Sequence, residues 1–211
     1  MTVARKLGLI AAFAIAFGFV ESSVVVYLRS LYYPEGFAFP LKVMSSGHLL
    51  VELMREAATL VMLAAVGMLV GSKRWERFGY FVVAFGIWDT FYYVWLKVLL
   101  NWPASLLDWD ILFLIPLPWI APVVAPILIS ILMIVSGSLI VIRIGKGRGF
   151  TPNSLSWSLS LSGVILVLYS FMKDTGATLQ GGVPSPYGYE LLIASLVLFL
   201  VAFLAAYRNP A

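Results

Sequence analysis

Residues 48–63 read His-Leu-Leu-Val-Glu-Leu-Met-Arg-Glu-Ala-Ala-Thr-Leu-Val-Met-Leu, a helix-length apolar run that contains three charges. On a 3.6-residue period, the polar residues inside this run share one helix face: Glu52, Arg55, Glu56 and Thr59. A charge at the centre of a bilayer costs from roughly 3 to more than 10 kcal/mol, so this face has to point at protein or water. The run therefore predicts a membrane helix with a polar side that faces an interior.

The composition supports a membrane protein. The chain has 211 residues, of which 62% are hydrophobic and only 11% are charged, and its mean hydropathy is +0.99. A soluble domain covers its core with many more charged residues than this. We therefore expect the lipid bilayer to be the main partner of the protein surface.

Six apolar segments have the length that a hydrocarbon core of about 30 Å requires. They predict an all-α integral membrane protein, a single transmembrane domain over residues 1–211 with six spans: 7–28, 48–70, 78–100, 119–142, 155–172 and 190–207. The first span follows Arg5 and Lys6, as in a signal peptide, but it continues past Glu21 and is interpreted as a retained anchor.

The basic residues predict the orientation of the chain. Lysines and arginines are enriched in the loops that stay in the cytoplasm. They gather before the first predicted span and in the loops after the second and fourth, which places both termini in the cytoplasm of a cell (inner or plasma) membrane. This asymmetry accounts for the net charge of +4, so nucleic acid is not an expected partner.

The segment before the fourth predicted helix contains several prolines. Residues 111–142 are apolar throughout, which is too long for one straight span. The prolines fall in the first half of this segment, at positions 116, 118, 122 and 126, where each removes a hydrogen-bond donor and disfavours helix in the preceding residue. We expect a broken or re-entrant backbone there, packed against protein or lining a cavity.

The first three predicted spans bring charged residues to a similar depth in the outer half of the membrane. The predicted ligand-binding residues are Glu21, Glu52, Arg55, Glu56, Asp89 and Tyr93, and Lys97 lies four residues beyond Tyr93 on the same side of its helix. Acids outnumber bases in this group, so some carboxylates should be protonated or bind a cation. A buried salt-bridge network that only fixes the helix register remains the structural alternative.

Other polar residues admit a weaker functional interpretation. His48, Glu52 and Glu56 are spaced as a carboxylate and imidazole metal site would be, but His48 is the only histidine and stands near the end of a span. Solvated helix ends are the favoured interpretation of Glu190 and of the pair Asp108 and Asp110. Tyr92, Tyr93 and the tryptophans are expected to pack or to anchor the protein at the interface. The sequence indicates no particular cofactor.

A short stretch resembles a known family. Glu35-Gly36 followed by Ser45-Ser-Gly-His-Leu49 is similar to the first signature of membrane undecaprenyl-pyrophosphate phosphatases, in which a glutamate and a histidine serve a pyrophosphate site. The resemblance implies such roles for Glu35 and His48. The similarity is confined to residues 35–49, the second glutamate of the family falls on Phe39, and the later arginine motif is absent. The chain is therefore not assigned to that family.

Three classes of function fit these patterns. The first is a binding or transport protein whose outer-half cavity takes a small cationic or zwitterionic ligand or relays protons. The second is an intramembrane enzyme that acts on a lipid through carboxylates or a carboxylate and histidine metal site. The third is a structural subunit that binds other membrane proteins. The sequence does not decide whether the protein is an enzyme.

Overall fold

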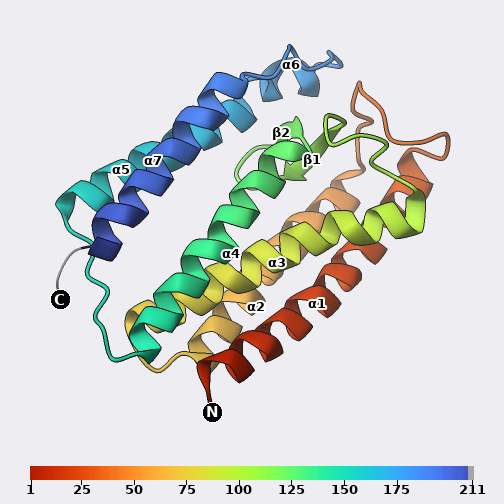
Figure 1. The fold of residues 1–211 in the computed structure, drawn as a ribbon. Coiled ribbons are helices and arrows are strands. Elements are labelled where there is room, and N and C mark those ends of the chain that lie inside the picture. Colours follow the sequence, from red (N-terminus) through yellow and green to blue (C-terminus); the bar gives the residue numbers. More distant parts are fainter. Residues whose placement is uncertain (209–211) are drawn as a thin grey trace.

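The computed structural model describes residues 1–208 and is built from six long helices (Figure 1). All six are long and apolar enough to cross a membrane. Their bounds are Val3–Tyr32 (α1), Ser46–Val70 (α2), Arg74–Leu100 (α3), Val124–Gly145 (α4), Ser154–Met172 (α5) and Tyr189–Arg208 (α7). A short helix, α6 (Thr175–Leu179), lies between α5 and α7, and a small hairpin separates α3 from α4.

The helices match five of the six predicted spans to within a few residues at each end. The fourth differs, because residues 119–122 form a strand and α4 begins at Val124. The two-stranded hairpin that precedes α4 is an addition that the sequence analysis does not predict. The fold is thus mostly helical and compatible with a membrane bundle.

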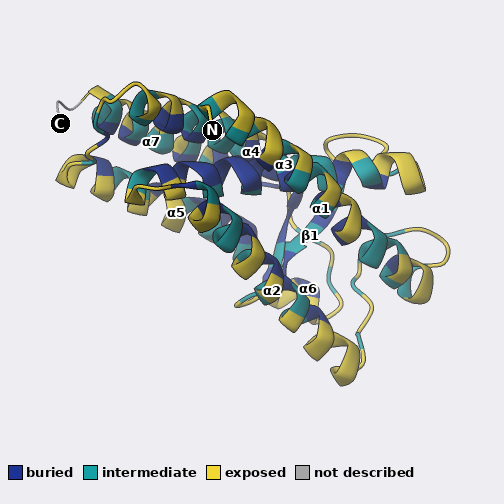
Figure 2. Cartoon of the chain, turned by 90° about the horizontal axis from the view of Figure 1, so that it is seen from below, coloured by how far each residue is buried: buried dark blue, intermediate teal, exposed yellow. Residues whose placement is uncertain are grey.

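Helix α3 is the centre of the bundle, since it packs on α1, on α2 and on α4. Helices α5 and α7 pack on one another, and α7 touches α4 (Figure 1). By contrast, α1 and α2 barely touch one another, although they are consecutive. Figure 2 shows α2 diverging from α1 toward the loop end of the bundle.

The hairpin joins the two halves of the bundle. Strand β1 (Trp109–Phe113) pairs antiparallel with β2 (Trp119–Pro122), and β2 also packs on α5. The Thr175 hydroxyl at the start of α6 donates a hydrogen bond of 2.5 Å to the Pro118 carbonyl. The hairpin, the loop 33–45 and α6 all lie at the same end of the bundle, which we call the loop end. The two ends of the described chain lie at the opposite end of the bundle, which we call the terminal end.

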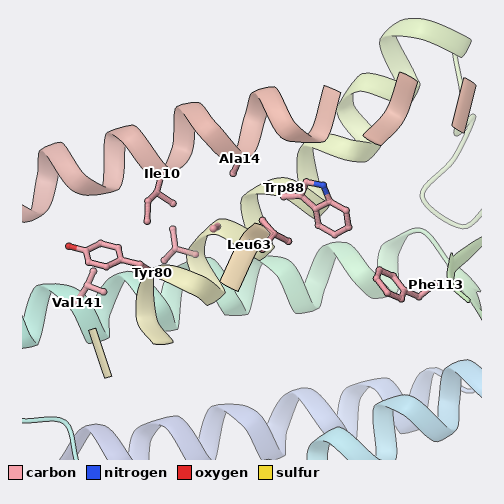
Figure 3. Close-up of a cluster of buried hydrophobic side chains, with 9 residues drawn as sticks. Ile10, Ala14, Leu63, Tyr80, Trp88, Phe113 and Val141 are labelled. Carbon is pink, nitrogen blue, oxygen red and sulfur yellow. The ribbon is translucent and has the colours of Figure 1, made fainter. Parts of the chain in front are cut away.

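The main core lies between α1, α2, α3 and α4 (Figure 3). Ile10 and Ala14 of α1, Leu63 of α2 and Tyr80 of α3 are almost completely buried there. Large apolar side chains elsewhere on the helices are exposed, as expected for surfaces that face lipid. The core therefore fixes α3 against its neighbours near the terminal end and leaves the loop end for polar side chains.

Glycines allow α3 and α4 to approach closely. A β-carbon added at Gly137 of α4 would lie 2.7 Å from the carbonyl oxygen of Gly79 and 2.6 Å from a Val82 methyl group on α3. At Gly86 of α3, an added β-carbon would lie 2.6 Å from the Ser130 carbonyl oxygen. Small residues at helix crossings of this kind are characteristic of membrane bundles.

We expect Gly137→Ala to lower the free energy of unfolding by about 1–3 kcal/mol, because the new methyl group overlaps backbone atoms of α3. The matched control is Gly8→Ala on α1, where an added β-carbon meets nothing within 4 Å. That substitution should leave stability unchanged or raise it by up to about 1 kcal/mol through helix propensity. Thermal unfolding in detergent measures both, and equal effects of the two variants would contradict the close crossing.

Candidate functional site

A cavity of about 500 Å³ lies at the loop end, between α1, α2, α3 and the hairpin. Loop 33–45 and the end of α6 complete its wall. Its volume is within the range of pockets that hold small molecules. The charged side chains that line the cavity are Glu21, Arg29, Lys42, Glu52, Arg55, Glu56, Asp89 and Asp110.

Arg55 connects α1 to α2 across the cavity. Its guanidinium forms an ion pair with Glu21 of α1 and a two-point contact with Glu52, in which Nε donates to Oε2 at 2.9 Å. Glu52 and Arg55 are three residues apart on α2, so their side chains meet on one helix face. The carboxylates of Glu21 and Glu52 are buried, while the Arg55 side chain keeps 20% of its surface accessible.

Thr59 extends the same polar face toward the terminal end. Its hydroxyl donates a hydrogen bond of 3.1 Å to Oε2 of Glu21 and is almost fully buried. Glu21 therefore receives two contacts from α2, one ionic and one neutral. Together with the contact between Tyr32 and His48 nearer the loop end, these contacts link two helices that otherwise barely meet.

Glu56 attaches the hairpin to α2. Both of its carboxylate oxygens accept the backbone N–H of Leu114, at 3.0 and 2.9 Å. Leu114 comes directly after β1, where the strand ladder ends and its N–H needs another acceptor. Glu56 is buried, and among the ion pairs found in residues 1–208 none includes it.

Asp89 of α3 is a second carboxylate whose donor is neutral. Its Oδ2 accepts a hydrogen bond of 2.7 Å from the Ser130 hydroxyl of α4, and its side chain lines the cavity. Like Glu56, it forms none of the ion pairs of the described chain. The two carboxylates thus have neutral donors in place of cationic partners.

Arg29 and Asp110 form a second ion pair, which the sequence analysis misses. Arg29 Nη2 lies 2.9 Å from Asp110 Oδ1, and both residues are buried. The guanidinium also stacks on Trp102, 3.7 Å from its ring centroid, and on Phe37 at 4.6 Å. The interpretation of Asp110 as a solvated helix end is therefore wrong, because the hairpin carries this side chain inward.

The carboxyl group of Asp110 has a raised pKa although Arg29 is its ion-pair partner. Burial raises the pKa of Asp110 from 3.8 to about 6, and the neighbouring Arg29 and the Ile111 N–H only partly oppose that effect. A hydrogen bond from the Tyr93 hydroxyl to the same carboxyl group also opposes the rise.

The structure brings most of the predicted ligand-binding residues together, with two exceptions in the wider predicted group. Glu21, Glu52, Arg55, Glu56 and Asp89 line one cavity. Tyr93 does not line it, because its ring is buried against Tyr92 and Trp102. Lys97 is exposed and donates to the carbonyls of Asn101 and Pro103.

The three residues of the candidate metal site, His48, Glu52 and Glu56, each contact a different partner. His48 lies at the exposed start of α2, where its Nδ1 is 2.6 Å from the Tyr32 hydroxyl. Glu52 is occupied by Arg55, and Glu56 by the hairpin backbone. No group of three histidine, cysteine, aspartate or glutamate residues within 1–208 is arranged to hold a metal ion.

The sequence gives only weak signals that Arg29 and Asp110 belong to the cavity. Arg29 lies about two helical turns after Glu21, close enough in angle to share a broad helix face. Asp110 carries no signal that separates it from Asp108, which caps the backbone N–H groups of Ala104 and Ser105 outside the cavity. Its position depends on the hairpin register, in which it stands opposite Ala121.

Comparisons of the chain with models of known protein families, with curated proteins and with solved structures found no match.

We expect Arg55→Met to lower the free energy of unfolding by about 3–5 kcal/mol, because it leaves Glu21 and Glu52 buried without their cation. The triple variant Arg55→Met, Glu21→Gln, Glu52→Gln removes the unpaired charges and should recover part of that loss. Denaturation with SDS in mixed micelles measures the difference. As a control, Lys146→Met at an exposed site should change stability by less than about 0.5 kcal/mol. A triple variant no more stable than Arg55→Met would argue against the ion pairs.

Asp110 should make the protein less stable as the pH rises. The pKa of Asp110 is higher in the folded protein than its ordinary value of 3.8, so between pH 4 and about 6 the folded state binds the proton more tightly. By linkage, the contribution of this group to stability is greatest below pH 4 and is lost as the pH rises through about 6. Unfolding midpoints from pH 4 to 8 should therefore fall less steeply in Asp110→Asn than in the wild type. Parallel profiles would contradict the burial of an ionisable Asp110.

Proposed function

We propose that the protein is a binding or transport protein that takes up a small organic cation or zwitterion in this cavity. The observation that carries the proposal is the charge balance of the cavity wall. Five buried or partly buried carboxylates line it, from Glu21, Glu52, Glu56, Asp89 and Asp110, against two guanidinium groups, from Arg29 and Arg55. If all were ionised, the site would carry three excess negative charges before Lys42 at its edge is included.

Such an excess of charge on buried and partly buried side chains can be removed in two ways. Either the carboxylates without a cationic partner take up protons, or a bound cation neutralises them. Glu56 and Asp89 are the two that have only neutral donors. A cationic ligand would therefore displace protons from these two groups when it binds, and the same exchange would couple ligand movement to proton movement.

Both arginines are engaged, so they would act on the ligand indirectly. Arg55 keeps Glu21 and Glu52 in place, and Arg29 does the same for Asp110. Lys42 is exposed at the edge of the cavity, with its ammonium 5.4 Å from the Tyr33 ring centroid. A zwitterion would place its amine among the carboxylates and its acidic group near Lys42.

We further propose that the chain spans a cell membrane with both termini in the cytoplasm and with the cavity in the outer half. The support is the concentration of basic residues at the terminal end, where cytoplasmic loops are expected. These residues are Arg5, Lys6, Lys73, Arg74, Arg77, Arg143, Lys146 and Arg148. The irregular segment before α4 would then lie at membrane depth only where it is covered by α5 and α6 or lines the cavity.

The carboxylates of Glu56 and Asp89 should determine cation binding. We expect Glu56→Gln and Asp89→Asn each to weaken the binding of ethanolamine or choline to protein in lipid nanodiscs by at least about tenfold, equivalent to 1.4 kcal/mol. Binding to the wild type should release protons into weakly buffered solution, and the two variants should release fewer. Isothermal titration calorimetry in two buffers of different ionisation enthalpy measures affinity and proton release together.

The matched control is Glu190→Gln, which removes an exposed carboxylate at the start of α7, outside the cavity. It should bind both cations as the wild type does. If neither cation binds the wild type, or if all three variants bind equally, the cavity is not a cation site.

A further inference from the structure

We infer that the terminal end of the bundle binds the phosphate head groups of anionic lipids. Three segments lie at that end in Figure 1: the start of α1, the turn from α2 to α3 and the loop from α4 to α5. Together they carry the residues that we call the basic surface: Arg5, Lys6, Lys73, Arg74, Arg77, Arg143, Lys146 and Arg148. The inference rests on the contacts, charges and aromatic neighbours of these residues, and it does not depend on what the cavity holds.

Contacts between helices bring the three segments together. The Lys6 ammonium of α1 lies 3.1 Å from Oε1 of Glu76 in the first turn of α3. At Gly145, the last residue of α4, an added β-carbon would lie 2.5 Å from a methyl group of Val3 at the start of α1. The start of α1 therefore touches both the start of α3 and the end of α4, and the basic residues of the three segments share one surface.

The basic surface has little acid to compensate its charge. Within residues 1–8, 71–77 and 143–153, Glu76 is the only acidic side chain. Its Oε1 accepts the Lys6 ammonium, and its Oε2 accepts the backbone N–H of Ser72 at 2.9 Å. Apart from Lys6, no member of the basic surface belongs to an ion pair within residues 1–208. Like charges on one surface repel one another, so a bound anion lowers the free energy of this surface.

Two arginines of the basic surface are already held in place. Arg77 Nε donates to the Gly71 carbonyl at 3.1 Å, and Arg143 Nε donates to the Gly149 carbonyl at 2.6 Å. Within residues 1–208, no hydrogen bond uses the Nη groups of either arginine. Guanidinium N–H groups of this kind bind phosphate oxygens in two-point contacts. Side chains that are held before binding lose less conformational freedom on binding, which favours a phosphate at these positions.

Aromatic side chains place the basic surface at the depth of lipid head groups. Trp75 at the start of α3 packs on Phe150, with ring centroids 5.5 Å apart, and on Trp157 of α5 at 6.1 Å. Trp157 is 54% exposed, and the Arg74 guanidinium lies 5.5 Å from the Trp75 ring centroid. Tryptophan beside exposed cations is typical of the membrane–water interface. A lipid can use both the charges and the tryptophans, whereas a soluble anion can use only the charges.

The proposed orientation supplies the anionic partner. With both termini in the cytoplasm, the basic surface lies against the leaflet that carries a negative surface charge. The attraction of that leaflet for lysine and arginine acts over about one Debye length, so exposed basic residues at the helix ends are within its reach.

The test counts the lipids that stay bound to the full-length protein. The protein is reconstituted in nanodiscs of phosphatidylglycerol and phosphatidylcholine in equal amounts, transferred to a mild detergent and analysed by native mass spectrometry. We expect the wild type to retain phosphatidylglycerol over phosphatidylcholine by at least about fivefold, and the double variant Lys146→Gln, Arg148→Gln to lower this preference by at least about threefold. Both residues are exposed, and their side chains form no ion pair within residues 1–208, so the variant should fold.

The matched control is the double variant Lys42→Gln, Lys173→Gln, which removes two cations from the loop end and should keep the preference of the wild type. A wild type without a preference, an unchanged preference in Lys146→Gln, Arg148→Gln, or an equal loss in the two double variants would overturn the inference.

Glycerol phosphate in large excess carries a phosphate without hydrocarbon chains and should leave the lipid bound. If it displaces the lipid, the basic surface binds soluble anions, and the assignment of a lipid is wrong. Each of these outcomes is independent of cation binding in the cavity, so the proposed function stands or fails separately.

Discussion

The ion pairs of Arg55 determine how the rest of the cavity is arranged. Helices α1 and α2 have few backbone positions close to one another, so the ion pairs of the guanidinium with Glu21 and Glu52 and the contact between Tyr32 and His48 connect them toward the loop end. Three charges in an apolar bundle are stable only when they are paired and protected from lipid. This requirement turns the polar side of α2 inward, and it holds α1 and α2 close enough to enclose a cavity but too far apart to fill it.

The hairpin closes that cavity because charged side chains of the helices bind one of its backbone N–H groups and its Asp110 carboxylate. Glu56 accepts the N–H of Leu114 at the end of β1, and Arg29 pairs with Asp110 inside the same strand. In each case a charged helix residue binds a group of the hairpin. The same contacts account for the excess of acid, since Glu56 and Asp89 are held by neutral donors and keep an uncompensated charge when ionised.

Much of the helical fold could be predicted from the sequence, because span length and mean hydropathy are local properties of each segment. The shared polar face of Glu52, Arg55 and Glu56 was also predictable, since it depends only on the helical period. The hairpin was not, because the prolines at positions 116 and 118 indicate a break without indicating a strand. The inward position of Asp110 depends on the register of β1 with β2, and the exclusion of Lys97 depends on carbonyl groups at the end of α3. Such pairings between distant segments leave no periodic signal.

The account depends most on one claim, that the space between α1, α2 and α3 is a ligand site and not only a network of ion pairs. A cryo-electron microscopy structure of the protein, purified from native membranes in lipid nanodiscs, tests it most directly. The account predicts non-protein density in this cavity beside Glu56 and Asp89. A cavity filled only by ordered water, or closed by direct packing of α1 on α2, would contradict it.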